Sequence, residues 1–424
     1  MTATAALRHP GGHRPPEPSG VPRARPLSVV HLITRLERGG SSDCTLLQAL
    51  GAARRGHRVT VASGPSREPS LLLEAARRQP RLRLVEIPTL ARRPCPIDDA
   101  RALVAIVRLL RAEPCDVLHT HTSKAGALGR LAAALLGRRR TVVHQPHGHL
   151  FYGYYGRLGS ALVVLAERLL APLARLQIAL SWRGAEEHLG RGIGRPGGFR
   201  VVRSGIDLRP CRRARQGRDA CRARLGYRAD DFVVGSLGRL EAIKGAGDLL
   251  RGFLLAAARR PRLRLFLGGD GPLRASLGEL ARASGLRDRV TIGGAWVAPG
   301  SVLPAFDLFV LASRNEGMGR ALVEAMATGL PVVASAVGGV PEVLEEGGCG
   351  LLIPPGDPEA IALAIGRLAD DEALAAALAR RARGRALAFG AGRMVRTLLE
   401  VYREVFSPAS CWPPLRPSPR MKRG

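Results

Sequence analysis

Aromatic residues are scarce in this chain of 424 residues. Phe, Trp and Tyr make up 4% of the sequence, although hydrophobic residues as a whole reach 46%. The hydrophobic cores must therefore be built from Ala, Leu and Val, a composition that suits helices packed on parallel sheets. The chain is too long for one ordinary core, so we expect two domains.

Lysine is almost absent, although the formal net charge is +30. Only Lys124, Lys244 and Lys422 are lysines among the 65 residues that are Lys or Arg. The arginines are spread along the whole chain, which indicates a compositional bias rather than a nucleic-acid-binding segment. We expect no nucleic-acid partner, but the positive field favours anionic donors and an anionic membrane surface.

From the sequence we also expect no paired cysteines, no leader and no membrane span. Its seven cysteines form no CxxC motif, which is typical of free thiols in a reducing compartment. Residues 1–20 contain no apolar signal segment, and Glu167, Arg168 and Arg175 interrupt the most apolar stretch, residues 158–180. We therefore expect a cytoplasmic protein, bound at most peripherally to the inner face of the membrane.

Carboxylate pairs of the Asp-x-Asp type, which bind donor phosphates through a metal ion, are missing as well. Five of the ten histidines do cluster within 31 residues, namely His119, His121, His144, His147 and His149. A zinc site is the rival interpretation of this cluster, but it has no HExxH motif and no nearby Cys or carboxylate ligands. We expect no metal ion and no other cofactor, so cations and helix dipoles would have to bind any phosphate.

Strands and helices alternate along most of the chain. In the first half, β-branched apolar runs predict strands at residues 27–33, 58–63, 82–87, 117–120 and 141–144. In the second half, the predicted strands are residues 232–236, 263–267, 290–292, 308–311, 332–334 and 351–353. The stretch 204–218 between the two series is polar and charged, and we expect it to be irregular, as is typical of an interdomain linker. This order predicts an α/β protein with two doubly wound parallel sheets, whose ligands bind at the carboxyl ends of the strands.

The loop after the predicted strand 308–311 offers a site for phosphate. Its residues are Glu316, Gly317, Met318 and Gly319. A helix begins near Arg320, and its free N–H groups and positive dipole would hold a phosphate or sugar oxygen that the glycines allow to approach. Glu324 lies about one turn further, roughly 6–8 Å away at a rise of 1.5 Å per residue, within reach of ribose hydroxyls. The alternative is that Glu316 caps the helix and that Glu324 is a solvated charge.

Two cations follow the predicted strand 232–236. Arg239 and Lys244 lie five residues apart and can neutralise a diphosphate leaving group, which Arg can bind with two hydrogen bonds. Surface charge is the alternative, and it is less convincing for Lys244 because lysine is so rare in this chain. In the first half, Gly39 and Gly40 follow the first predicted strand and precede a helix, which by itself is weak evidence for a ligand site.

Three of the five tyrosines occur in one stretch, beside a phenylalanine. The residues are Phe151, Tyr152, Tyr154 and Tyr155. A glycine-flexed aromatic loop can stack on acceptor sugar rings or enter a membrane interface, and a packed loop is the alternative. The helix predicted next, residues 157–176, has arginines beside an apolar stripe and would extend a membrane-facing surface.

Several of these segments together resemble one enzyme family. The spacing of Glu316 and Glu324, with GLPVVASAVGGVPEV after it, resembles the donor-site motif of family 4 glycosyltransferases. GRL…KG at 238–245, GDGPL at 269–273 and HTHTSKAG at 119–126 are similar to further motifs of that family. The resemblance covers about residues 27–406, in the expected order.

This resemblance implies a retaining glycosyltransferase with the GT-B fold, in which two Rossmann-like domains face a central cleft. The acceptor-side domain would be residues 27–206, the donor-binding domain residues 207–390, and a crossover helix residues 391–406. Residues 1–26 and 407–424 are rich in Pro, Gly and Arg without periodicity, and we predict that both are disordered tails.

The resemblance also implies roles for the candidate residues. The residues that would stabilise the departing nucleoside diphosphate are Arg239, Lys244 and the amides of Gly317, Met318 and Gly319, with Gly39 and Gly40 facing the phosphates or the acceptor. Glu316 would orient the sugar and Glu324 the ribose. His147, with His144 as the competing assignment, would lie beside the sugar and the acceptor.

The implied partners are a nucleotide-sugar donor and a sugar or lipid-linked acceptor, such as a precursor of a polysaccharide. Another GT-B enzyme acting on nucleotide sugars, such as an epimerase, is the nearest alternative. A basic nucleic-acid-binding protein is the alternative from a different class, and it would bind nucleic acid with a steep dependence on salt.

Overall fold

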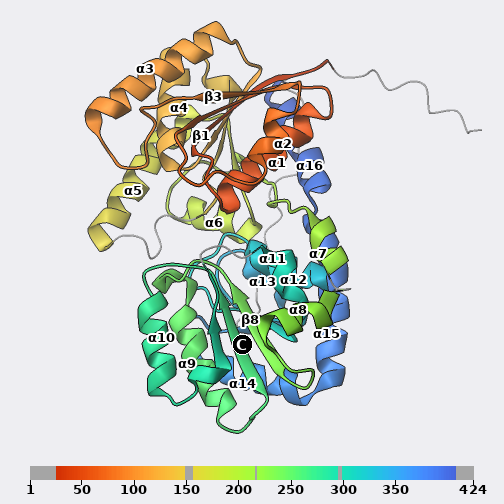
Figure 1. Cartoon of the computed structure of the whole chain (residues 1–424). Helices are drawn as coiled ribbons and strands as arrows, with labels where there is room; N and C mark the ends of the chain where they lie inside the picture. The colour runs from red at the N-terminus through yellow and green to blue at the C-terminus, as the bar shows by residue number, and fades with distance from the viewer. Residues whose placement is uncertain (1–24, 149–155, 215–216, 295–297, 407–424) are drawn as a thin grey trace, which may run out of the picture.

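Two parallel β-sheets, each covered by helices, form the two halves of the computed structural model (Figure 1). The structure describes residues 25–148, 156–214, 217–294 and 298–406. The tails, apart from residues 25 and 26, and the loop residues Phe151, Tyr152, Tyr154 and Tyr155 lie outside the described residues. What the sequence predicts for them therefore stays a prediction.

The first sheet has seven strands in the order β3-β2-β1-β4-β5-β6-β7, and all neighbours are parallel. Its strands are β1 (Ser28–Arg35), β2 (Arg58–Gly64), β3 (Leu82–Glu86), β4 (Val117–His121), β5 (Val142–Gln145), β6 (Leu176–Ala179) and β7 (Phe199–Val201). The sequence predicts the first five of these strands but misses β6 and β7. Both are short, and β6 continues an apolar run that gives it no period of its own.

The second sheet has six strands in the order β10-β9-β8-β11-β12-β13, again parallel throughout. Its strands are β8 (Phe232–Leu237), β9 (Leu263–Gly268), β10 (Val290–Ile292), β11 (Leu308–Leu311), β12 (Val332–Ser335) and β13 (Leu351–Ile353). In each sheet the strand order reverses beside the first strand, between β1 and β4 and between β8 and β11. Ligands of doubly wound sheets bind in the crevice at such a point.

The first sheet packs against helices on both faces. The helices of this half are α1 (Gly40–Ala53), α2 (Leu73–Arg77), α3 (Pro96–Ala112), α4 (Ser123–Leu135), α5 (Arg157–Leu170) and α6 (Trp182–Gly190). Leu46 and Leu50 of α1 belong to the core on one face, and Ile106 of α3 and Leu128 of α4 belong to the core on the other.

The second sheet is covered in the same way. Its helices are α7 (Leu208–Ala214), α8 (Arg218–Leu225), α9 (Ala246–Ala257), α10 (Arg274–Ala283), α11 (Pro299–Val302), α12 (Arg320–Thr328), α13 (Val340–Val343), α14 (Pro358–Asp370) and α15 (Glu372–Ala386). Leu322 of α12 packs in the core of one face, and Leu250 of α9 and Ile365 of α14 pack in the core of the other. The predicted α/β class, with two doubly wound parallel sheets, is confirmed.

The last helix, α16 (Ala391–Phe406), returns to the first half and packs against α1 (Figure 1). Val395, Leu398 and Tyr402 of α16 are buried in the same core as α1. The contact is close, because a Cβ on Gly51 of α1 would lie 2.3 Å from a methyl carbon of Val395. A glycine is therefore required where these two helices meet.

Two predictions about local structure are wrong. The stretch 204–218 is not irregular throughout, because α7 lies within it and its Cys211 is buried in the core beside α12. The helix predicted over 157–176 ends earlier: α5 stops at Leu170, and a short 3-10 turn containing Pro172 follows. Proline removes a backbone donor and ends the regular helix here. None of the described helices is long and apolar enough to cross a membrane.

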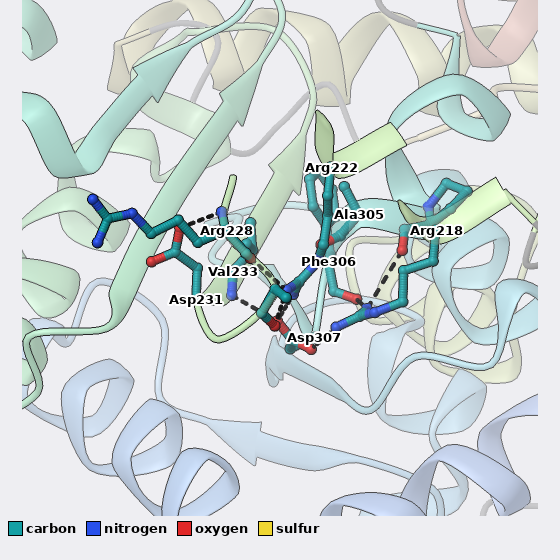
Figure 2. A network of polar contacts seen from close by, with 10 residues as sticks. Arg218, Arg222, Arg228, Asp231, Val233, Ala305, Phe306 and Asp307 are labelled. Atoms are coloured by element: carbon teal, nitrogen blue, oxygen red, sulfur yellow. Dashed lines mark hydrogen bonds and ion pairs between the residues drawn. The ribbon is translucent and has the colours of Figure 1, made fainter. Parts of the chain in front are cut away.

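A partly buried network of polar contacts fixes the second sheet at the edge that lies away from the carboxyl ends of its strands (Figure 2). Asp307, which directly precedes β11, accepts hydrogen bonds from the guanidinium groups of Arg218 and Arg222 and from the backbone N–H of Val233. These bonds tie α8 to the amino ends of β8 and β11. The network therefore supports the sheet but takes no part in the cleft.

Candidate active site

A cleft of about 720 Å³ lies between the two halves, at the carboxyl ends of both sheets. The predicted residues that line it are Gly39, Gly40, His147, Arg239, Lys244, Glu316, Gly317, Met318, Gly319 and Glu324. Their loops follow β1, β5, β8 and β11, which are strands near the two points where the strand order reverses. The tertiary structure thus brings these residues together, whereas His144, the competing histidine, does not line the cleft.

Lys244 is held against Glu316 in this cleft. The Nζ atom of Lys244 lies 2.6 Å from Oε1 of Glu316, and the same oxygen accepts a hydrogen bond of 3.0 Å from Oγ of Ser313. Gly245, with φ of +67°, makes this approach possible, since a Cβ there would lie 1.9 Å from the backbone oxygen of Ala312. A cation is thereby fixed beside the end of β11.

Arg239 lies in the same loop but is less constrained. Its side chain is 53% exposed and forms an ion pair of 2.6 Å with Glu241. The GDGPL segment supports this loop, because Leu240 N donates to Asp270 O at 2.8 Å and Leu273 N donates to Leu240 O at 3.0 Å. Gly269 is required at this contact, where a Cβ would lie 1.9 Å from the backbone oxygen of Gly238.

The N-terminus of α12 has no side-chain cap. Its N-cap residue is Gly319 in the left-handed conformation, and no side chain of the described residues caps the first amides. Glu316 therefore does not cap this helix, which removes one alternative drawn from the sequence. The side chain of Met318 is only 3% exposed and packs in the core, so the loop offers mainly backbone amides to a ligand.

Glu324 is not a solvated surface charge. Its side chain is 14% exposed, and burial raises its pKa to about 7, while the nearby Arg320 opposes this rise. Burial penalises the ionised form of a carboxylic acid, which is why the pKa moves upward. A ligand hydroxyl that donated to this carboxylate would replace part of the lost hydration.

Of the two histidines considered for the cleft, His147 is the one that lines it. His144 is 1% exposed, contacts Thr120 Oγ1 at 3.0 Å and lies so close to α4 that a Cβ on Gly126 would be 2.4 Å from its ring. His147 has a left-handed backbone, with φ of +64°, and burial followed by the charge of Arg320 lowers its pKa to about 3. Its imidazole is therefore neutral at ordinary pH.

Behind His147 runs a row of ring contacts that the sequence does not reveal. His147 Nε2 lies 2.8 Å from His121 Nδ1, and His121 Nε2 lies 2.9 Å from His31 Nδ1. Tyr402 of α16 follows, with its hydroxyl 3.4 Å from His31 Nε2 and 2.7 Å from His119 Nδ1. We call this set the imidazole row; its members are His147, His121, His31, His119 and Tyr402. His31 and Tyr402 lie far from the other members in sequence, so no local motif could have nominated them.

Three members of this row could in principle hold a metal ion. Ring nitrogens of His31, His119 and His121 all lie within 4.8 Å of one another. The contact of 2.9 Å between His31 and His121 is shorter than the separation of about 3.3 Å between two nitrogens that each lie 2.0–2.1 Å from a tetrahedral zinc ion. It is instead the length of a hydrogen bond, so these nitrogens are already committed to one another.

Arg320 is a further cleft residue, which the sequence marks only as a helix start. Its guanidinium lies 3.5 Å from a carboxylate oxygen of Asp43 on α1 and donates to the backbone oxygen of Gly205 at 3.3 Å. A Cβ on Gly40 would lie 3.0 Å from the Arg320 side chain, and one on Gly317 would lie 3.5 Å from the backbone oxygen of His147. The two halves therefore touch across the cleft.

Two facing Rossmann-like domains, with two cations and an uncapped helix end in the cleft between them, define a glycosyltransferase of the GT-B type. Comparison with known proteins agrees with this class. The family model "Glycosyltransferase Family 4" matches residues 38–209, and the model "Glycosyl transferases group 1" matches residues 217–385. The chain belongs to family 4 of the glycosyltransferases.

The UDP-Gal:alpha-D-GlcNAc-diphosphoundecaprenol alpha-1,3-galactosyltransferase of Escherichia coli is 30% identical over 288 residues, which span 67% of this chain and 74% of the relative. The D-inositol 3-phosphate glycosyltransferase of Thermobispora bispora is 32% identical, over 68% of this chain and 70% of the relative. Among solved structures, Anabaena Alr3699/HepE in complex with UDP superposes with a TM-score of 0.75 at 24% identity and covers 89% of this chain and 100% of its own. The structural likeness shows the fold.

Proposed function

We propose that this enzyme transfers a sugar from a nucleoside diphosphate sugar to a lipid-linked or polysaccharide-precursor acceptor, with retention of the anomeric configuration and without a metal ion. One observation carries the proposal: Lys244 and the uncapped N-terminus of α12 lie in the same cleft, at the ends of adjacent strands. Fixed positive charge and free amides are what a departing diphosphate needs.

The donor would lie mainly against the second domain. Lys244, Arg239 and the amides after Gly317 would bind the two phosphates, while Glu324 would accept hydrogen bonds from the ribose. Glu316 would leave Lys244 when the phosphate arrives and orient the sugar hydroxyls. The names of the relatives support this class of donor, since one contains UDP-Gal and one solved neighbour is a complex with UDP.

The acceptor would enter from the first domain, past Gly39 and Gly40. The galactosyltransferase relative acts on a diphosphoundecaprenol-linked sugar, which supports a lipid-linked acceptor here. Retention follows the resemblance to family 4. Metal independence is supported by the absence of an Asp-x-Asp motif in the sequence and by the cations that take its place.

A membrane-facing surface would bring such an acceptor to the cleft. Helix α5 has no buried residue, and its exposed leucines recur at the spacing of one helical face. They are Leu158, Leu162, Leu165 and Leu169, between 51% and 76% exposed. We propose that this leucine stripe rests on an anionic membrane, which the excess of arginine would also attract.

The test is a thermal-shift screen with UDP, GDP and ADP sugars. We expect one group of donors to raise the melting temperature of the wild type, and Glu324→Ala to abolish that shift. Glu279→Ala, which removes an exposed carboxylate from α10, is the matched control and should keep the full shift. No shift with any donor would count against the proposal.

Product analysis with the donor that shifts the protein completes the test. Proton NMR of the product would show a glycoside with the anomeric configuration of the donor, formed equally well in the presence of EDTA. Release of an epimerised nucleotide sugar or a free sugar instead of a glycoside would support the epimerase alternative, and an inverted product would contradict retention.

A further inference from the structure

The imidazole row runs from the cleft to the core behind it and joins four separate parts of the chain. His31 lies on β1, His119 and His121 lie on β4, His147 follows β5, and Tyr402 lies on α16. All members except His147 are fully buried, so solvent does not reach the polar atoms of their side chains. Each contact between ring nitrogens has the length of a hydrogen bond, and the contact of Tyr402 with His31, at 3.4 Å, is the longest of the row.

Burial favours the neutral form of every imidazole in the row. Burial, with the charges of neighbouring histidines, lowers the pKa of His31 to about 3 and lowers the pKa of His119 and His121 well below the usual value. A neutral imidazole carries one N–H donor and one bare acceptor nitrogen. The hydrogen bonds along the row therefore all run in one direction, since each ring that accepts at one nitrogen donates from the other.

The buried end of the row decides this direction. His119 Nε2 is buried and has no hydrogen-bond partner in the part of the chain that the structure describes. If that nitrogen carried the hydrogen, the row would end in a buried N–H without an acceptor, a rarer situation in proteins than a buried acceptor without a donor. This preference favours His119 protonated on Nδ1, which then donates to the hydroxyl oxygen of Tyr402.

The remaining hydrogens follow from this first one. The Tyr402 hydroxyl donates to His31 Nε2, His31 Nδ1–H donates to His121 Nε2, and His121 Nδ1–H donates to His147 Nε2. The hydrogen of His147 is then left on Nδ1, which has no protein partner among the described residues, while the residue itself lines the cleft.

We propose that His121, His31 and Tyr402 are positioning residues that fix His147 as the tautomer protonated on Nδ1, so that it presents a hydrogen-bond donor to the cleft. The inference rests on the proposed function, because it assigns the ligand of His147 to the reacting sugar. A donor at this point would bind a sugar or acceptor oxygen and could not take a proton from it. His147 thus binds and orients, and it is not a general base.

The tautomer can be observed without any substrate. Two-bond proton–nitrogen correlation spectra of protein labelled with ¹⁵N-histidine distinguish a protonated from a bare nitrogen in each ring, and His147→Asn identifies the signals of His147. We expect His147 to show a protonated Nδ1 and a bare Nε2 throughout pH 6–8. A protonated Nε2 in the wild type would overturn the proposal.

Two substitutions of His121 test whether the row sets this state. Asn places an amide nitrogen near the position of Nδ1 and can still donate to His147, whereas Leu fills the space without a donor. We expect His121→Asn to keep the wild-type signals of His147 and a kcat within about threefold, and His121→Leu to mix the two tautomers and lower kcat about tenfold at unchanged donor KM. Unchanged His147 signals in His121→Leu would show that the row does not control the tautomer.

Tyr402→Phe tests the far end of the row and replaces His121→Leu if that variant does not fold. It keeps the ring and removes the hydroxyl, and we expect a fall in kcat of about threefold together with altered His31 and His119 signals. Tyr227→Phe, which removes a hydroxyl beside the core of the second domain, is the control and should change neither. Tyr402→Phe with wild-type kcat and spectra would contradict a role for α16.

Two results separate this proposal from others. Stoichiometric binding of added Zn²⁺ with loss of the histidine hydrogen bonds would make the row a metal site and overturn the inference. If the wild type transferred no sugar from any donor, the proposed function would fail, but the spectra would still decide whether the row fixes His147.

Discussion

The ammonium group of Lys244 lies 2.6 Å from the carboxylate of Glu316, although 72 residues separate them in sequence. They meet because β8 and β11 are neighbours in the sheet and both loops leave at its carboxyl edge. The pair has two consequences. Each charge holds the other in the cleft, and in the proposed function an incoming diphosphate would compete with Glu316 for the lysine.

Lys244→Met should lower kcat about 100-fold, the usual cost of removing one group that stabilises the charge of the transition state. It also leaves Glu316 beside the phosphate site without its counter-ion. The control is Lys124→Met, because Lys124 binds Asp99 at 2.6 Å and does not line the cleft. Steady-state kinetics with the identified donor measure both, and an equal loss in the two variants would point to a general loss of charge instead.

Glu324 predicts a pH dependence of donor binding. Its pKa of about 7 means that the carboxylate is protonated below this pH, when it accepts ribose hydrogen bonds less well. The affinity for the nucleoside diphosphate should therefore rise between pH 6 and pH 8 in the wild type, as measured by calorimetry. Glu324→Gln should bind more weakly and lose most of this dependence. A wild-type affinity that stays flat over this range would contradict the raised pKa.

The same group predicts a dependence of stability on pH. Because the folded-state pKa is above the unfolded one, the native protein holds this proton more tightly, and its stability falls as pH rises from about 4.5 to about 7. The contribution is up to about 3 kcal/mol, at 1.36 kcal/mol per pKa unit. The free energy of unfolding, measured in urea at several pH values across this range, should contain this loss in the wild type but not in Glu324→Gln.

Gly245→Ala should destabilise the second domain strongly. A left-handed φ alone costs a non-glycine residue about 1 kcal/mol, and here the added Cβ would also collide with the backbone oxygen of Ala312. We expect a loss of about 3 kcal/mol or more in the free energy of unfolding, as measured by urea denaturation. Gly226→Ala is the matched control, since Gly226 has φ of +76° but open space around it, and it should cost about 1 kcal/mol.

The leucine stripe of α5 predicts binding to anionic vesicles. Leu162→Glu combined with Leu165→Glu should weaken co-sedimentation with phosphatidylglycerol vesicles at least about tenfold, because each Leu contributes roughly 1.5–3 kcal/mol on burial. The control is Leu255→Glu, on a leucine of α9 that is 55% exposed. Equal sedimentation of all three proteins would remove α5 from the membrane proposal.

Much of the fold could be predicted from the sequence because its strands are continuous apolar runs between helical patterns. Eleven predicted strands, from residues 27–33 to residues 351–353, all have counterparts in the structure. β7 was missed because its residues, Phe199, Arg200 and Val201, contain a charge and form no continuous apolar run, and α7 was missed because its charged residues conceal the apolar face that carries Cys211.

The sequence could predict those residues of the candidate site that lie in loops directly after a strand. Arg239, Lys244 and Glu316 occur within a few residues of a strand end, and parallel sheets bring such ends to one edge. Arg320 and Asp43 could not be paired in this way, because they belong to different domains and no sequence pattern fixes how the domains face each other.

The sequence by itself determined which elements form, at which strand ends the charged and glycine-rich loops emerge, and to which family the motifs are similar. These features depend on local patterns and on fixed spacing along the chain. Only the tertiary structure decided that His31 and Tyr402 stand behind His147, that Glu316 binds Lys244 instead of capping α12, and that Glu324 is buried. Those outcomes depend on contacts between segments that are distant in sequence. Packing and desolvation set the geometry of these contacts, and no periodic pattern of residues along the chain predicts it.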